Sequence, residues 1–300
     1  MQRAHFLFVD PRVGKCKERM RAIGMRTKLA ALIFLVMTAA NLGCVQTRKD
    51  DSNLVVFRDR QSVERNRPIL IAHRGGVLTE TTPECSLAAI RLAKQQGYAM
   101  VELDVQKSRD GVPIVFHDSD LEKACGVDNR IANMDSEQIP KIKFLQSDQT
   151  IVTLGLALEE CVALSMGVML DVKVRDDEQF FQTVANLIKK YKYEGSTITI
   201  NTDPALRRCF KGIVMLSVTG DEFNRAQKGE TFDLTGKYWF GLPHRIPNEM
   251  VKCLQQSGAY VIPAINTFRY PEDNHYELAR EDTYIMARME QPVLVPKRAM

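Results

Sequence analysis

The sequence predicts an α/β fold, specifically an irregular (β/α)8 barrel of the TIM type. From residue 69 onward, short apolar runs alternate with runs of helical periodicity, which is typical of a mostly parallel sheet. The 300 residues are 45% apolar, enough to bury one large core. Charged residues stand at or just beyond the carboxyl ends of several apolar runs, where such barrels carry their active sites.

The first two strands are predicted from their hydrophobic patterns. Residues 69–72 form a continuous apolar run, and residues 99–105 alternate apolar with acidic side chains. Between them, Pro83 begins a helix that ends near Gly97, because proline is favoured in the first turn of a helix. This order of strand, helix and strand predicts that the first two strands are parallel.

The connection between the second and third strands lacks the helix that a parallel crossover usually needs. Residues 109–111 read RDG, a strong tight-turn signal, and the third strand follows at residues 114–116. We therefore expect a short, hairpin-like link that makes the barrel irregular and places His117 beside the acidic residues of the second strand. Residues 119–150 hold no long periodic run and should form an insertion with short helices.

The remaining elements continue the alternation. The apolar runs typical of strands are residues 168–174, 197–200, 213–218, 238–241 and 260–265. The runs with helical spacing are residues 154–164, 178–191, 204–210, 222–227, 247–256 and 281–289. Together with the first three strands, these runs bring the predicted strands to about eight.

The N-terminus has the pattern of an export signal. Arg26 and Lys28 precede an apolar run at residues 29–40 that is short for a transmembrane helix, and Leu-Gly-Cys follows, ending at Cys44. This resembles a bacterial lipoprotein signal, which predicts an exported protein of the cell envelope that is anchored to the membrane by lipid on Cys44. Simple signal cleavage and an uncleaved anchor remain alternatives, and translation could start at Met25.

Three segments follow from this organisation: a leader at residues 1–44, a polar tether at residues 45–67 and the barrel domain at residues 68–300. The seven cysteines include no CxxC pair, so neither a disulfide framework nor a zinc site is indicated. The net charge of +4 is modest, and no basic block with interleaved aromatic residues points to nucleic acid.

Two histidines and several acidic residues accompany the first three strands. His73 and Arg74 follow the first strand, and His117 follows the third. Glu102 and Asp104 alternate with apolar residues of the second strand, so both should point to the same face. Two carboxylates on one face suit a divalent cation, and histidines can carry protons near neutral pH.

These residue types can together cleave a phosphodiester. The reaction requires stabilised charge on the phosphoryl oxygens, an activated nucleophile and a protonated leaving group. A metal ion can offset the charge, and the planar guanidinium of Arg74 can bind the phosphate. Two histidines on opposite sides of phosphorus can exchange the roles of base and acid.

The order and spacing of the motifs resemble the glycerophosphodiester phosphodiesterase family. The matching motifs are HRG at residues 73–75, PE at 83–84, ELD at 102–104, DG at 110–111 and HD at 117–118. The resemblance covers roughly residues 68–200. It implies metal-dependent hydrolysis of glycerophosphodiesters such as glycerophosphocholine to sn-glycerol 3-phosphate and an alcohol.

By this resemblance, His73 and His117 form the general acid–base pair. The implied ligands of one divalent cation, Ca2+ or Mg2+, are Glu102, Asp104 and Asp171. In the scheme of the family, a glycerol hydroxyl of the substrate attacks phosphorus and expels the alcohol. Water then opens the resulting cyclic phosphate.

The resemblance also implies supporting residues. Arg74 and Lys173 would bind the substrate phosphate, and Glu84 would brace the HRG loop. The chain departs from the usual family pattern at two positions: Asp171 replaces a glutamate, and Cys85 replaces an asparagine. The shorter Asp171 puts the metal affinity in question, and Cys85 changes the hydrogen bonding of the loop.

Two other functions remain open. A phosphodiesterase of the sphingomyelinase D or lysophospholipase D type would act on lipids that carry an acyl chain. A catalytically inactive binding module of the envelope would keep the fold without turnover, which the departures at Cys85 and Asp171 permit. Binding of a divalent ion and release of glycerol 3-phosphate distinguish the predicted enzyme from both.

Overall fold

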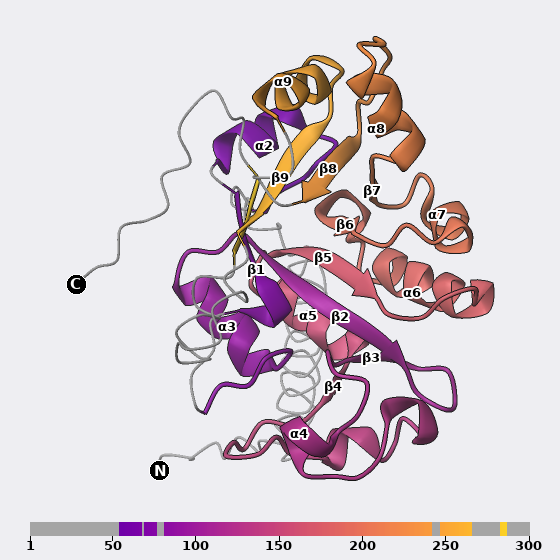
Figure 1. Ribbon diagram of the computed structural model, residues 1–300. Coiled ribbons are helices and arrows are strands. Elements are labelled where there is room, and N and C mark those ends of the chain that lie inside the picture. Colours follow the sequence, from indigo (N-terminus) through magenta and orange to yellow (C-terminus); the bar gives the residue numbers. More distant parts are fainter. Residues whose placement is uncertain (1–53, 68, 77–80, 242–246, 266–282, 287–300) are drawn as a thin grey trace, which may run out of the picture. The chain divides into compact units, whose positions relative to one another are not determined.

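The computed structural model describes residues 54–67, 69–76, 81–241, 247–265 and 283–286 (Figure 1). All of these lie in one compact unit, residues 52–300. The expected leader at residues 1–44 lies outside the described residues, so export and lipidation stay predictions. Within the described ranges, no helix has both the length and the apolar character needed to cross a membrane.

One sheet of ten strands forms the centre of the domain (Figure 1). Its parallel strands are β1 (Ile69–Ala72), β2 (Met100–Lys107), β5 (Gly167–Val172), β6 (Thr197–Thr199), β7 (Met215–Ser217), β8 (Lys237–Gly241) and β9 (Tyr260–Ile265). Each of these strands pairs in parallel with the next in this order. The predicted α/β fold with a mostly parallel sheet is therefore confirmed.

The strand β10 (Thr283–Met286) pairs antiparallel with both β9 and β1. The pairings therefore lead from β1 through seven other strands and back to β1, a ring of eight strands. We predicted a helix over residues 281–289, and this prediction is wrong at residues 283–286. The threonine, tyrosine and isoleucine of this segment favour a strand, and hydrogen bonding to two neighbouring strands outweighs the weak helical spacing.

The strand β3 (Pro113–Val115) lies outside this ring of eight. It returns antiparallel along β2 and pairs in turn with β4 (Val152–Thr153). The predicted hairpin-like link is thus confirmed, but β10 rather than the third strand completes the ring. The reason is the length of β2, since its first residues pair with β1 and its last three pair with β3.

The predicted insertion after the third strand is also present. It contains the short helices α4 (Glu122–Cys125), η2 (Ile131–Asn133) and η3 (Ile139–Lys141). Apolar side chains of the insertion, including Leu121, Ile131 and Ile139, are fully buried in a small core of their own. Because Ile114 and Phe116 belong to the same core, the insertion fixes the strand that leads to His117.

The six helices predicted between residues 83 and 256 flank the sheet. They are α3 (Leu87–Gln95), α5 (Leu154–Ala163), α6 (Glu178–Lys190), α7 (Pro204–Phe210), α8 (Gly220–Gln227) and α9 (Asn248–Gln256). The helix α3 begins four residues later than Pro83 because the Ser86 hydroxyl accepts the backbone N–H of Ala89 and caps it there.

Side chains alternate between the two faces of the barrel strands. Met100 and Met169 belong to one buried cluster, whereas Val101 and Val168 belong to another that includes residues of the flanking helices. Because the period along a strand is two, Glu102 and Asp104 share the face of Met100. The acidic residues therefore lie above an apolar layer inside the barrel.

Residues 54–67 close the other end of this apolar layer. We expected them to belong to a polar tether, but they include the helix α2 (Arg60–Arg65). Val55, Phe57 and Val63 are buried in the same cluster as Met100 and Met169. This part of the expected tether belongs to the folded domain, because its apolar side chains cover the end of the barrel interior.

Candidate active site

Three carboxylates meet where β2 and β5 run side by side. The parallel register places Asp104 directly beside Asp171, and Glu102 precedes Asp104 by two residues on the same face. One oxygen from each of the three lies within 4.8 Å of the others. Glu102 and Asp104 are each only 1% exposed, whereas Asp171 is partly exposed. Strand pairing alone therefore assembles the predicted ligand set.

The charge in this group is only partly compensated. Lys173 Nζ lies 2.7 Å from Asp104 Oδ1 and also contacts Asp171. Burial raises the pKa of Glu102 well above its usual range, and the neighbouring Asp104 raises it further. Burial lowers the pKa of Lys173, but the two aspartates outweigh this effect and raise it. Three oxygen donors with one lysine fit the preference of a hard divalent cation.

The HRG loop follows β1 and is tied to the same carboxylates. Arg74 adopts left-handed backbone angles (φ 52°, ψ 39°), and its backbone N–H donates to Glu102 Oε2 at 2.9 Å. Gly76 has φ 139°, and a Cβ there would lie 2.6 Å from the carbonyl oxygen of Ala89 on α3. The glycine lets the loop pack closely against α3, which holds the loop at the carboxylates.

His73 and Arg74 point to different acids. His73 Nε2 lies 3.7 Å from Glu102 Oε2, so the imidazole borders the buried carboxylates. The Arg74 guanidinium pairs with Glu84, with Nη1 at 3.0 Å from Oε2. Burial lowers the pKa of Arg74, but the neighbouring acids, chiefly Glu84, together outweigh this effect and raise it, so the guanidinium stays charged. Glu84 therefore does brace the side chain that the sequence assigned to phosphate binding.

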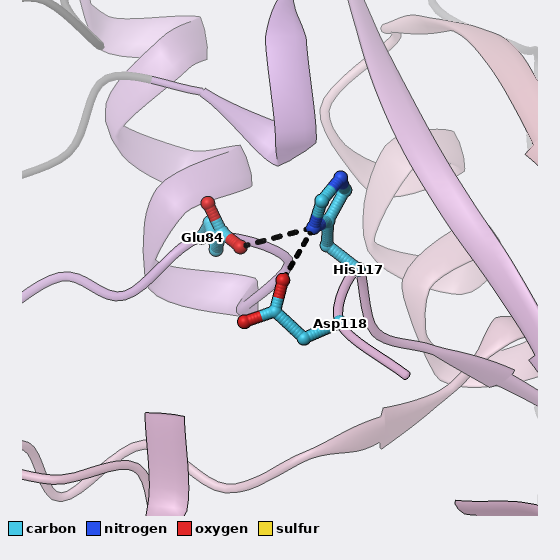
Figure 2. A group of neighbouring side chains, drawn as sticks. All are labelled: Glu84, His117 and Asp118. Carbon is cyan, nitrogen blue, oxygen red and sulfur yellow. Dashed lines mark hydrogen bonds and ion pairs between the residues drawn. The ribbon is translucent and has the colours of Figure 1, made fainter. Parts of the chain in front are cut away.

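His117 belongs to a second group, with Glu84 and Asp118 (Figure 2). Its Nδ1 lies 2.7 Å from Asp118 Oδ1 and 4.0 Å from Glu84 Oε1. The side-chain amide of Gln106 donates to the backbone carbonyls of residues 116–118 and fixes this turn. Since a carboxylate accepts from Nδ1–H, the lone pair of the neutral imidazole is at Nε2.

In both groups, the possible ligand atoms lie close enough together to hold one metal ion. The groups differ in how many of their carboxylates are already paired with basic side chains. In the second group, Glu84 pairs with Arg74, and His117 pairs with Asp118. In the first group, Lys173 is the one cation that makes a salt bridge to an aspartate, as far as the described residues show. The first group is therefore the better match for a cation.

Contacts link all the predicted site residues at one end of the sheet, where the carboxyl ends of β1, β2 and β5 meet. The predicted residues brought together are His73, Arg74, Glu84, Glu102, Asp104, His117, Asp171 and Lys173. Sequence reasoning gave no role to Asp118, although its place directly after His117 was a usable signal.

Cys85, which we expected to change the hydrogen bonding of the loop, also contacts one of the predicted metal ligands. Its Sγ lies 3.8 Å from Asp104 Oδ2, and its backbone N–H donates to the Arg74 carbonyl at 2.6 Å. Burial raises the pKa of the Cys85 thiol well above its usual range, and Asp104 raises it further. The neutral thiol therefore acts as a weak donor to one of the predicted ligands.

The chain is similar in sequence to a known protein family and to several named relatives. Residues 73–235 match the sequence model of the glycerophosphoryl diester phosphodiesterase family. Glycerophosphodiester phosphodiesterase 1 of Rattus norvegicus is 35% identical over 121 residues, which cover 38% of this chain and 36% of the relative. A lysophospholipase D of Mus musculus is 28% identical over 153 residues, 47% of this chain and 45% of the relative. The chain thus spans less than half the length of these relatives.

The fold is also similar to that of solved structures. A phosphodiesterase of Oleispira antarctica, solved with the product sn-glycerol-3-phosphate, superposes with a TM-score of 0.51. The match covers 64% of this chain and 81% of that one, at 22% identity. This likeness confirms the predicted TIM-type barrel.

Proposed function

Because this chain belongs to the glycerophosphoryl diester phosphodiesterase family, we propose that it hydrolyses glycerophosphodiesters to sn-glycerol 3-phosphate and an alcohol. The observation that carries the proposal is the convergence of three carboxylates with two histidines at the carboxyl end of the sheet. The similar rat enzyme and the product-bound structure of similar fold support this substrate class.

We assign one divalent cation, Ca2+ or Mg2+, to Glu102, Asp104 and Asp171. The buried, negatively charged oxygen set supports this assignment and does not discriminate between the two ions. When bound, the ion supplies positive charge that offsets the charge on the phosphoryl oxygens. Lys173 holds the carboxylates of Asp104 and Asp171 together and adds a further positive charge beside the substrate.

Arg74 binds the substrate phosphate in this proposal. Its guanidinium is charged and is oriented by Glu84, so its planar N–H groups are arranged before the substrate arrives. The same Glu84 borders His117, which supports a phosphate position between the two histidines. Orientation before binding lowers the entropic cost of reaching the reactive geometry.

His73 and His117 transfer the protons. One imidazole accepts the proton of the attacking hydroxyl, and the other donates a proton to the leaving alcohol. Asp118 accepts the Nδ1 proton of His117, which leaves Nε2 to exchange protons with the substrate. When water opens the cyclic phosphate, the two histidines exchange roles.

A second candidate uses the same site on a different substrate. The similarity to the mouse lysophospholipase D favours hydrolysis of lysophospholipids, which would release lysophosphatidic acid in place of glycerol 3-phosphate. Both activities would use the same metal and the same histidines, so an assay distinguishes them by the substrate that is consumed and the product that is released.

The test is an assay of the full chain with glycerophosphocholine and with lysophosphatidylcholine. We expect glycerol 3-phosphate from the first substrate, its loss with EDTA, and recovery with Ca2+ or Mg2+. Lysophosphatidic acid from the second substrate alone would replace the first proposal with the second. No product from either substrate with any divalent ion would contradict both and favour a binding module.

A further inference from the structure

A cavity of about 530 Å³ lies at the end of the barrel opposite to the carboxylates. Its walls include Met215, Lys237 and Tyr260, which are the first residues of β7, β8 and β9. Asp104 and Asp171 lie toward the carboxyl ends of β2 and β5, which run parallel to these strands. The cavity is therefore separate from the candidate active site.

The segment before β1 forms one side of this cavity. Phe57, Arg58, Arg60, Glu64 and Arg67 belong to the walls, and α2 lies beside α9 and β9 (Figure 1). The ring of Phe57 packs edge-on against that of Tyr260, with centroids 6.4 Å apart. The cavity exists because the folded segment at residues 54–67 covers this end of the sheet.

The charged side chains of the walls are mostly basic. Arg58, Arg60, Arg67 and Lys237 outnumber the two acids, Glu64 and Glu194, for a net charge of +2. Two arginines share the carboxylate of Glu64: its Oε2 lies 3.2 Å from Arg67 Nη1, and its Oε1 lies 4.0 Å from Arg60 Nε.

The contacts of the other two basic wall residues, Lys237 and Arg58, determine how much positive charge the walls keep. Lys237 pairs with Glu222, which is outside the walls. Arg58 donates to the backbone carbonyls of Gly212 and Ile213, and it has no carboxylate partner among the residues described here. With Lys237 paired to Glu222, three arginines and two acids remain in the walls, which leaves them a net charge of +1.

Two buried donors of the walls have no hydrogen-bond partner in the described part of the chain: Arg67 Nε and Gln255 Nε2. Buried polar groups in proteins are nearly always paired, so two orphans in one cavity require an acceptor. One comes from the segment before β1 and the other from α9, and both residues line the same cavity. Apolar side chains such as Leu216 and Val261 complete the walls.

We propose that this cavity binds a small organic anion in which a phosphate or carboxylate is attached to a compact apolar body. The positive walls and the two orphan donors receive the anionic group, while Phe57 and Tyr260 contact the body. The volume falls within the range of small-molecule sites, roughly 300–1,000 Å³. This site is independent of the proposed hydrolysis and of its metal.

Calorimetry of the full chain with phenyl phosphate tests the proposal. This probe has the anion and the body, whereas inorganic phosphate and phenol each have only one of them. All titrations use an Arg74→Met background, which weakens binding of phosphate at the candidate active site. We expect phenyl phosphate to bind more tightly than either of the other two probes.

A matched pair of variants locates the binding. Arg67→Met removes an orphan donor, and we expect about tenfold weaker binding of phenyl phosphate, as for a lost charge-assisted hydrogen bond. Arg65→Met is the control, because Arg65 lies on α2, pairs with Asp59 and is not in the walls. Gln255→Leu provides a second test if Arg67→Met fails to fold.

Three outcomes overturn the proposal. The first is that phenyl phosphate fails to bind in the Arg74→Met background, which would show that any binding to the wild-type chain takes place at the candidate active site. Arg67→Met and Gln255→Leu bind it as tightly as Arg65→Met does. Phenol binds as tightly as phenyl phosphate, which shows that the anion has no part.

Discussion

The two acidic groups of the candidate active site differ in where they are built and in how they are paired. Glu102, Asp104 and Asp171 lie on adjacent strands, and two of the three are almost fully buried. Glu84, His117 and Asp118 lie on loops and are partly exposed (Figure 2). Strands fix positions closely, which suits a metal, whereas a partly exposed imidazole can exchange protons with a substrate.

Pairing separates the groups further. Each group has one histidine beside a carboxylate, His117 at Asp118 and His73 at Glu102. In the loop group, Arg74 pairs with one of the two carboxylates, whereas in the strand group Lys173 is, within the described chain, the one lysine or arginine that makes salt bridges to any of the three carboxylates. The comparison teaches that ligand spacing alone does not identify a metal site. A more useful criterion for a metal site is the negative charge of the carboxylates that the protein's own basic side chains leave uncompensated.

The largest expected effect is that of His117→Ala. The loss of one proton-transfer group should lower kcat for glycerophosphocholine by roughly 10²–10⁴-fold. Affinity for the divalent ion should stay unchanged, because His117 belongs to the loop group. Steady-state kinetics and calorimetry measure the two quantities, and a large loss of ion affinity in this variant would break the division between the groups.

Asp118→Asn should have a smaller effect. The amide no longer stabilises a positive charge on His117, so kcat should fall about 10–100-fold with KM nearly unchanged. Asp120→Asn is a suitable control, because Asp120 is close in sequence and lies outside both groups. Equal kcat values for these two variants would show that Asp118 does not position His117.

The smallest expected effect is that of Glu84→Gln. The amide can still accept from Arg74, but it loses the ion pair that orients the guanidinium. We expect KM to rise about threefold to tenfold, with a lesser change in kcat, because the loss falls on phosphate binding. A pure loss of kcat would instead place Glu84 with the proton-transfer residues.

The strand group could be predicted from the sequence because it depends on local rules. Alternation in β2 puts Glu102 and Asp104 on one face, and the short RDG link returns the chain to His117. The same rules placed the six helices that flank the sheet to within a few residues. These elements could be predicted because hydrophobic periodicity and turn residues specify them locally, without contacts to distant parts of the chain.

The failures depend on contacts between distant parts of the chain. The segment before β1 was expected to be a tether, because two apolar residues such as Val55 and Phe57 are too few to predict a folded segment. Their burial depends on the end of the barrel interior that they cover. The strand at residues 283–286 exists because β1 and β9 are there to pair with it. Cys85 approaches Asp104 from a residue with a left-handed backbone, φ 60°, which no local signal indicated.

The central claim is that the divalent ion binds the strand group and not the loop group. The most direct measurement is calorimetric titration of Ca2+ and of Mg2+ into the wild-type chain, Asp104→Asn and Asp118→Asn. We predict that Asp104→Asn loses binding and that Asp118→Asn keeps the wild-type affinity. Loss of binding in Asp118→Asn with retention in Asp104→Asn would contradict the account.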